Sequence, residues 1–237
     1  MPALRIGLTG SMGAGKSEAL RAFARLGARV LDADALGRYA LSRLRPVRES
    51  VRALLGDAAF GPDGEPCRPA IAAAVFSDGE LLKKYEALIQ PSIRALWLDP
   101  PDSEDFWNFS RARNAESAAD RAGALAECDA RFPSFGGLAQ LVAERIAANP
   151  PTAVEVPLLF EKKLESDFDF CVDVLCSRQL RCKRLKGRGM SVREISARDA
   201  FQLPPEAKAS QADAVLFNES DIEFLQMQAA LCLSRLI

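Results

Sequence analysis

Gly10-Ser-Met-Gly-Ala-Gly-Lys-Ser17 is the stretch of sequence that decides the fold. It fits the pattern G-x-x-x-x-G-K-[ST], and it lies between residues 5–9, which predict a short buried strand, and residues 17–26, which predict a helix. This order is typical of a phosphate-binding loop, because glycines let successive backbone N–H groups point at one anion and the helix N-terminus adds positive partial charge. The alternative is a glycine-rich turn that binds nothing, and the flanking strand and helix disfavour it.

The residue types within the loop predict separate tasks. Lys16 is expected to reach the β- and γ-phosphates of a nucleotide, and the Ser17 hydroxyl is expected to ligate Mg²⁺. The backbone of the whole loop is expected to cradle the phosphates. The predicted nucleotide-binding residues of the loop are Ser11, Met12, Gly13, Ala14, Gly15, Lys16 and Ser17.

The composition is that of an ordinary globular chain, and its net charge creates no strong electrostatic field. Of the 237 residues, 49% are hydrophobic and 27% are charged, and the formal net charge of −1 gives no general attraction to nucleic acid or anionic membrane. No apolar run reaches the roughly 18 residues that a membrane-spanning helix needs. The first expected strand begins so early that it leaves no room for a signal peptide, so we expect a cytoplasmic protein.

The cysteine and histidine counts exclude several kinds of chemistry. The six cysteines form no C-x-x-C pair, and we expect them to be free thiols in a reducing compartment. The chain has no histidine, which removes Ser-His and Cys-His catalytic arrangements and any zinc site with a histidine ligand. Acid–base work must therefore fall to Asp, Glu, Lys or Cys.

Two carboxylates follow the second expected strand. Residues 27–31 read as a glycine helix stop and a strand, which ends in Asp32-Ala33-Asp34. Ligands of parallel α/β sheets bind outside the carboxyl ends of the strands, so a carboxylate here suits a base that accepts a hydroxyl proton. Aspartate is also a favoured helix N-cap. The residues alone leave open which of Asp32 and Asp34 is the cap and which is the base.

The middle of the chain predicts helices without a strand between them. Residues 35–45, 47–55, 69–76 and 79–90 have helical patterns, the last opened by a capping box at 77–80 and ended by Pro91, and together they predict a helical substrate-binding insertion. Residues 99–137 have eight acidic residues, four arginines and no clean periodicity. We interpret them as a solvated, mobile excursion that is partly helical around 111–128 and packs down in part through its aromatic residues.

The C-terminal part of the chain predicts three more strands, at 152–156, 168–176 and 213–217. Between the last two lie a basic helix at 177–186, a break at 187–189 and a helix opened by a capping box at Ser191. Arg181, Arg184 and Arg188 surround the break, which predicts a lid that brings cations to a transferred phosphoryl group. A solvated basic face is the alternative.

These elements predict an α/β fold, a three-layer α/β/α P-loop sandwich with a five-stranded parallel sheet, a helical substrate-binding insertion and a lid. The nucleotide-binding core is expected to comprise residues 1–34 and 150–237, with the lid at about 177–202. Residues 35–149 are expected to form the helical region, with the extra insertion at about 99–137.

The combined motifs resemble those of the dephospho-coenzyme A kinase family. The likeness covers most of the chain except about 99–137; it includes the opening strand and loop, Val30-Leu-Asp-Ala-Asp34, Val156-Pro-Leu-Leu-Phe-Glu161, the lid arginines, and Ala212-Asp213 followed by Asn218. The chain departs from the family in having Gln90 where a histidine is usual and Gly189 where an acidic residue is usual.

The resemblance implies transfer of the γ-phosphate of ATP to the ribose 3′-hydroxyl of dephospho-CoA. Asp34 would accept the hydroxyl proton, Lys16 and Mg²⁺ would hold the phosphates, Arg184 and Arg188 would stabilise the transferring charge, and Asn218 would bind the nucleotide. Glu155 is the nearest candidate for the acid that helps to hold Mg²⁺, although strand alternation leaves its direction open. The expected partner is the small-molecule substrate dephospho-CoA. We expect the protein to be a monomer that binds neither nucleic acid nor membrane.

Other functions remain open at this stage. The chain can be another small-molecule P-loop kinase, acting on a nucleoside, a nucleotide or a shikimate-like hydroxyl, or a degenerate nucleotide-binding protein. A regulatory GTPase is disfavoured, because the sequence contains no Asn-Lys-x-Asp tetrapeptide for reading guanine.

Overall fold

A computed structural model describes residues 3–111 and 118–237 of the chain, so part of the expected helix around 111–128 lies outside the described residues. The described residues divide into two compact units. The first unit contains the residues before Asp32 and those that follow the gap, and the second unit runs from Asp32 to the gap. Of the helices that these residues form, none combines the length and apolar character needed to cross a membrane.

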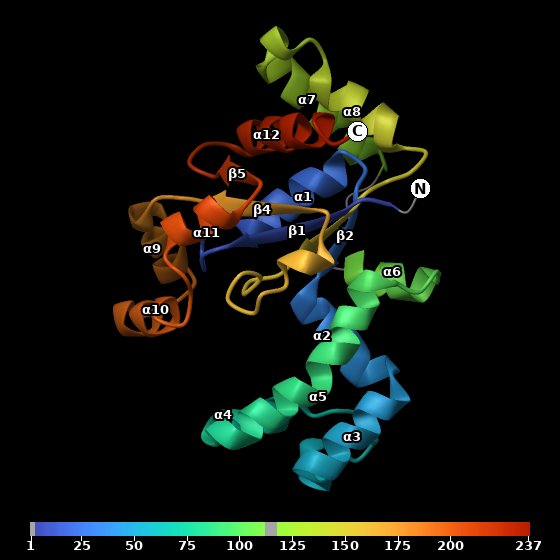
Figure 1. Ribbon diagram of the computed structural model, residues 1–237, viewed down its shortest axis with the longest axis vertical. Coiled ribbons are helices and arrows are strands. Elements are labelled where there is room, and N and C mark those ends of the chain that lie inside the picture. Colours follow the sequence, from blue (N-terminus) through green and yellow to red (C-terminus); the bar gives the residue numbers. More distant parts are fainter. Residues whose placement is uncertain (1–2, 112–117) are drawn as a thin grey trace. The chain divides into compact units, whose positions relative to one another are not determined.

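The first unit is built on the expected five-stranded parallel sheet (Figure 1). Its spatial order is β2-β3-β1-β4-β5. β1 lies in the middle, so the loop that follows it opens at the centre of the sheet's carboxyl edge, where α/β folds bind ligands. The strands are β1 (Arg5–Gly10), β2 (Arg29–Asp32), β3 (Thr152–Glu155), β4 (Phe170–Leu175) and β5 (Ala214–Phe217).

The helices of the first unit are α1 (Lys16–Arg25), α7 (Ala118–Arg131), α8 (Leu138–Ile146), α9 (Arg178–Gly187), α10 (Val192–Asp199), α11 (Pro205–Gln211) and α12 (Ile222–Ser234). In Figure 1, α1, α7, α8 and α12 lie together against the sheet, and they share one hydrophobic core with it. Val172 and Val174 of β4 belong to that core. Because successive strand residues point to opposite faces, Asp173 faces the other side, which α11 covers.

The second unit is helical, as the absence of strand patterns predicts. Its helices are α2 (Ala33–Arg43), α3 (Arg45–Leu55), α4 (Arg68–Ser77), α5 (Gly79–Leu98) and α6 (Glu104–Arg111). Short 3-10 turns complete the described elements: η1 (Asp57–Ala59) here, and η2 (Pro133–Phe135) and η3 (Glu165–Asp167) in the first unit.

The expected end of a helix before Pro91 is wrong, because α5 continues through Pro91 to Leu98. A proline inside a helix removes one backbone hydrogen bond, but α5 buries Ile89, Ile93 and Trp97 around it, and this packing outweighs the local penalty. The N-cap is also different from the expected one. The Asp78 side chain, not that of Ser77, accepts hydrogen bonds from the first turn.

The interpretation of residues 99–137 as a solvated excursion is wrong for α7, whereas the expected packing through aromatic residues is confirmed for α6. α6 packs on α2, where the fully buried ring of Phe106 lies edge-on to Tyr39. α7 packs on α1, α8 and α12 and contributes Leu125 and Cys128 to the core. The Asp129 carboxylate also accepts hydrogen bonds from the first backbone N–H groups of α8. The acidic composition concealed the few apolar residues that anchor α7.

The grouping of elements differs from the expected domain boundaries. α7 and α8 belong to the unit that contains the sheet, whereas the sequence patterns assigned all of residues 35–149 to a helical substrate-binding region.

The six cysteines are free thiols, as expected. Burial raises the pKa of Cys128 and of Cys171 to about 11, which keeps these thiols protonated and unreactive near neutral pH.

Candidate active site

The phosphate-binding loop follows β1 and leads directly into α1. Gly15 is the N-cap of α1 and has a φ of 97°, a left-handed conformation that favours glycine. A Cβ atom at this position would lie 1.8 Å from Nδ2 of Asn218. Glycine is therefore required both by the backbone conformation and by the close approach of Asn218.

Lys16 is buried within the loop. Its Nζ donates hydrogen bonds to the carbonyl oxygens of Gly10 at 3.0 Å and Ser11 at 3.2 Å. Burial lowers the pKa of Lys16, and the nearby charges of Glu155 and Asp173 oppose this effect. The ammonium group thus lies inside the curve of the loop, where phosphate oxygens bind in loops of this sequence.

Side-chain oxygens of Ser17 and Glu155 lie close together at the start of α1. The Ser17 hydroxyl donates a hydrogen bond of 3.2 Å to Oε2 of Glu155. Glu155 lies on the same strand face as Ala153, a core residue on the α1 side of the sheet, which settles the direction that the sequence left open. A hydroxyl and a carboxylate are ligands that suit Mg²⁺, which normally takes one or two protein oxygens together with phosphates and water.

Within residues 3–111 and 118–237, no group of three or more His, Cys, Asp or Glu side chains is arranged to hold a metal ion.

Asp32 and Asp34 have different positions at the start of α2. The Asp32 side chain is the N-cap, and its Oδ1 accepts a hydrogen bond of 2.8 Å from the backbone N–H of Asp34. Asp34 lies in the first turn with an exposed side chain. Because Asp32 serves as the cap, the Asp34 carboxylate is not used for capping and is exposed. Both residues belong to the second unit.

The lid helix α9 brings two of the three predicted arginines, Arg181 and Arg184, onto the loop. Nη1 of Arg184 donates to the carbonyl oxygen of Ala14 at 3.3 Å, and Nη2 donates to Oδ1 of Asn218 at the same distance. Nδ2 of Asn218 donates to the same Ala14 oxygen at 2.9 Å. Arg184 and Asn218 therefore meet at the phosphate-binding loop. Arg188 is exposed just beyond the end of α9.

Two lid residues hold the loop at Met12. Nε of Arg181 donates to the Met12 carbonyl oxygen at 2.9 Å, and Oε1 of Gln202 accepts from the Met12 N–H at 3.1 Å. Arg181 is buried and also pairs with Asp199, the last residue of α10, at 2.5 Å. Both backbone groups of Met12 are thus bound by side chains from residues 181–202.

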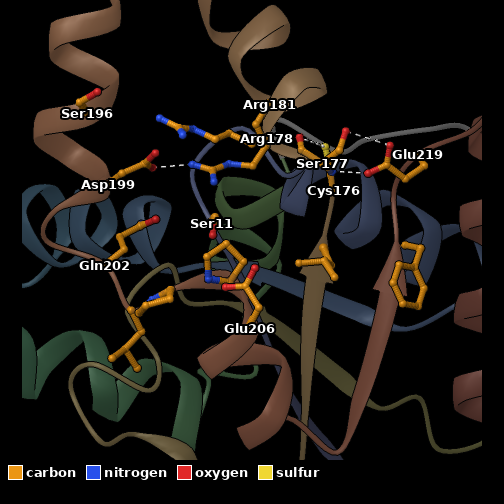
Figure 2. Close-up of a pocket in the computed structure, with 15 residues that line it drawn as sticks. Ser11, Cys176, Ser177, Arg178, Arg181, Ser196, Asp199, Gln202, Glu206 and Glu219 are labelled. Carbon is orange, nitrogen blue, oxygen red and sulfur yellow. Dashed lines mark hydrogen bonds and ion pairs between the residues drawn. The ribbon is translucent and has the colours of Figure 1, made fainter.

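A pocket of about 640 Å³ opens beside this contact (Figure 2). Its volume is within the range of sites for small molecules and cofactors. Figure 2 shows Arg181 reaching toward Asp199, with Gln202 below Asp199 on the same side, Ser11 near the centre and the Ser177–Glu219 pair on the other side. The pocket lies within the first unit, between the loop, the lid helices and the ends of β4 and β5.

Buried charges lie on the sheet face opposite the core. Asp173 is 1% exposed and faces the same side as its register partner Thr9, and burial raises its pKa to about 6. The positive charges of Lys208 and Lys16 oppose that rise. Lys208 is fully buried and forms an ion pair of 2.8 Å with Glu161.

Sequence patterns gave uneven information about these residues. Spacing found the loop, the basic residues around 187–189 indicated Arg184, and the family resemblance indicated Asn218. A single Asp inside the otherwise apolar β4 was a detectable signal for Asp173, since strands buried on both faces normally lack charge. Gln202 and Lys208 had no such signal, because their partners are far away in the sequence.

Comparisons with known proteins agree with this geometry. The profile of the dephospho-CoA kinase family matches residues 4–99 and 133–223. The dephospho-CoA kinase of Deinococcus radiodurans is 33% identical over 230 residues, which cover 96% of this chain and 90% of that protein. The corresponding protein of Streptomyces avermitilis is 30% identical over 224 residues, covering 94% and 89%.

Solved structures are similar in fold. The crystal structure of TT1252 from Thermus thermophilus superimposes with a TM-score of 0.68 at 28% identity and covers 100% of both chains. A dephospho-CoA kinase from Campylobacter jejuni has a TM-score of 0.54 at 17% identity, covering 98% of this chain and 96% of that one, and supports the fold alone. The matched residues include the phosphate-binding loop, both aspartates, the lid and Asn218. The chain belongs to the dephospho-CoA kinase family.

Proposed function

We propose that this protein transfers the γ-phosphoryl group of ATP to the ribose 3′-hydroxyl of dephospho-CoA, the final step of coenzyme A synthesis. Family membership supports the acceptor. The observation that carries the proposal is the meeting of Lys16, Arg184 and Asn218 at one glycine-rich loop, because phosphoryl transfer depends mainly on positioned positive charge and hydrogen-bond donors.

The loop and lid residues have distinct tasks in this proposal. The backbone N–H groups of residues 11–17 bind the phosphates, and the Lys16 ammonium moves from its own loop carbonyls to the β- and γ-phosphate oxygens. Arg184 and Arg188 stabilise negative charge on the transferring group. Asn218 holds the loop from the nucleotide side through Ala14.

Asp34 is the proposed base. Its exposed carboxylate lies in the first turn of α2 and is not used for the cap, so it is available to accept the proton of the attacking hydroxyl. In a loose transition state the proton leaves late, and the base mainly orients the hydroxyl. The contribution of Asp34 to the rate is therefore expected to be smaller than that of a base in a reaction whose nucleophile must lose its proton before the transition state.

Ser17 and Glu155 would hold Mg²⁺ through the hydroxyl and carboxylate oxygens that lie 3.2 Å apart. When bound, the ion neutralises charge on the β- and γ-phosphates. The hydrogen bond between the two side chains keeps both oxygens at the start of α1, next to the position of the phosphates.

The test is release of ADP by the purified protein with ATP and Mg²⁺ against a panel of acceptors. Dephospho-CoA is expected to be phosphorylated at its 3′-hydroxyl, with loss of turnover in EDTA and recovery when Mg²⁺ is restored. Nucleoside, nucleoside monophosphate and shikimate arms represent the other small-molecule kinases. Turnover of one of these, without turnover of dephospho-CoA, would contradict the proposal. Tight ATP binding without turnover of any acceptor would favour a degenerate binding protein.

A further inference from the structure

Residues 157–161 have no task in the proposed reaction, although they follow β3 at the edge of the sheet where ligands bind. Oε1 of Glu161 accepts a hydrogen bond of 2.9 Å from the backbone N–H of Leu203. Leu203 is the first residue after the lid segment, which we define as residues 177–202. Glu161 therefore binds the chain at the point where the lid segment returns to the sheet.

The Glu161 carboxylate is itself held in place by the buried ammonium group of Lys208. Nζ of Lys208 lies 2.8 Å from the same Oε1 and donates a second hydrogen bond of 3.0 Å to the carbonyl oxygen of Pro157. Lys208 is fully buried, and the Glu161 side chain is 13% exposed. A buried pair of this kind adds little net stability over apolar residues of similar volume, but it fixes the geometry of the groups around it.

The residue beside this anchor acts on the phosphate-binding loop. Gln202 precedes Leu203, and its Oε1 accepts the hydrogen bond from the Met12 N–H at 3.1 Å. Fixing the backbone at Leu203 limits where the Gln202 side chain can reach. A continuous path of short contacts therefore runs from Lys208 through Glu161 and the 202–203 backbone to Met12.

We propose that Glu161 is a positioning residue that fixes the pivot of the lid segment and, through Gln202, the backbone of the phosphate-binding loop at Met12. All of these residues belong to the first unit. The proposal concerns the nucleotide-free protein, and only its kinetic consequence rests on the proposed function.

Single substitutions would leave one buried charge without a partner and could prevent folding, so the test uses two matched double variants. Glu161→Gln/Lys208→Met removes both charges but keeps an amide oxygen that can accept from the Leu203 N–H. Glu161→Leu/Lys208→Met removes both charges and the acceptor. The loss of Lys208 is common to both, and the Thr9 hydroxyl still donates to the Pro157 carbonyl in each.

The measurement is amide-resolved hydrogen exchange by NMR on the nucleotide-free proteins. The Leu203 amide is expected to exchange about tenfold faster in Glu161→Leu/Lys208→Met (the Leu variant) than in Glu161→Gln/Lys208→Met (the Gln variant). This is the effect of losing one hydrogen bond. The Met12 amide is expected to exchange faster as well, although Glu161 does not contact it. Gln202→Leu is the reference for a free Met12 amide. It should speed exchange at Met12 and leave Leu203 protected by Glu161.

Faster exchange at Leu203 with no change at Met12 would show that the Glu161 contact is only structural and would overturn the proposal. No difference at Leu203 between the two double variants would overturn it as well. In steady-state kinetics, kcat of the Leu variant is expected to be about tenfold below that of the Gln variant. If the wild-type protein does not phosphorylate dephospho-CoA, the proposed function falls, whereas the exchange results still decide the role of Glu161.

Discussion

Lys16 and Asp34 contribute at different stages of the proposed reaction, so their substitutions separate binding from chemistry. Lys16 contacts phosphates that are charged both before and during transfer. Lys16→Ala is therefore expected to weaken ATP binding and also to lower kcat. Asp34→Asn keeps size and polarity but removes the base, so it should leave the ATP dissociation constant nearly unchanged. Its kcat should fall by about 10², the lower end of general-base effects.

Asp32→Asn is the matched control, because asparagine caps helices about as well as aspartate. The measurements are kcat and the ATP dissociation constant for all three variants. A slow Asp32→Asn protein beside a normal Asp34→Asn protein would show that cap and base are exchanged. Normal turnover of both would make these carboxylates structural.

Asp173 predicts a pH-dependent stability at the residue scale. Its pKa in the folded protein is about 6, above the usual value of 3.8, because burial disfavours the charged form. Its contribution to stability is therefore fully present below about pH 4 and is lost as the pH rises through 6. Asp173→Asn cannot ionise. Its Tm relative to wild type should rise by about 5 °C between acidic and mildly alkaline buffer.

Thermal unfolding of both proteins at about pH 4.5 and about pH 7.5 checks this prediction. Asp102→Asn is the control, because Asp102 is exposed and should give the same Tm difference in both buffers. A constant Tm difference for Asp173→Asn would mean that the lysines at positions 16 and 208 fully compensate the buried carboxylate.

At the scale of elements, α7 is part of the core although it lies between the two segments that the family profile matches. Leu125→Ala is expected to lower the free energy of unfolding by about 2–4 kcal/mol, because the side chain is 8% exposed and its removal leaves a cavity beside α1 and α12. Glu127→Ala on the exposed face of the same helix should change it by about 0.5 kcal/mol or less.

Urea denaturation of the two variants measures both effects. Similar stabilities for Leu125→Ala and Glu127→Ala would show that α7 does not pack in solution. Replacement of residues 99–137 by a flexible linker would then keep the protein folded, as the solvated interpretation predicts. With α7 in the core, the same replacement is expected to destabilise the first unit.

For the whole molecule, the division into two units predicts two separable ligand footprints. The phosphate-binding loop and the lid contacts lie in the first unit, and Asp34 with α3–α5 lies in the second. ADP with Mg²⁺ is expected to slow hydrogen exchange in residues 10–17 and 181–218 and to leave α3–α5 nearly unchanged. Dephospho-CoA is expected to slow exchange within α2–α5, the helical region proposed to bind the substrate.

Hydrogen exchange with mass spectrometry, each ligand added alone, makes this comparison. Pantetheine, the part of dephospho-CoA that remains without the nucleotide, is a useful third ligand. The residues that it protects would locate the binding site of the pantetheine arm of dephospho-CoA. Protection by dephospho-CoA that is confined to the first unit would assign the second unit a role other than substrate binding.

Local patterns in the sequence determined the fold class and the nucleotide loop. Glycine spacing identified residues 10–17, apolar runs located the five strands, and the Ser191–Glu194 capping box marked α10. These features depend on backbone conformation and on neighbours within a few residues, so their physical cause is contained in a short segment. The candidate residue Lys16 was found in the same way, whereas Arg184 was indicated by the basic residues around 187–189 and Asn218 by the family resemblance.

Only the tertiary structure decided which partners the remaining residues meet. The direction of Glu155 and the continuation of α5 through Pro91 depend on packing against distant parts of the chain. The structure also assigns the N-cap of α2 to Asp32 rather than Asp34. The pairing of Glu161 with Lys208 and Leu203 joins positions more than forty residues apart. Such contacts arise from the path of the chain through the sheet, which no local pattern encodes.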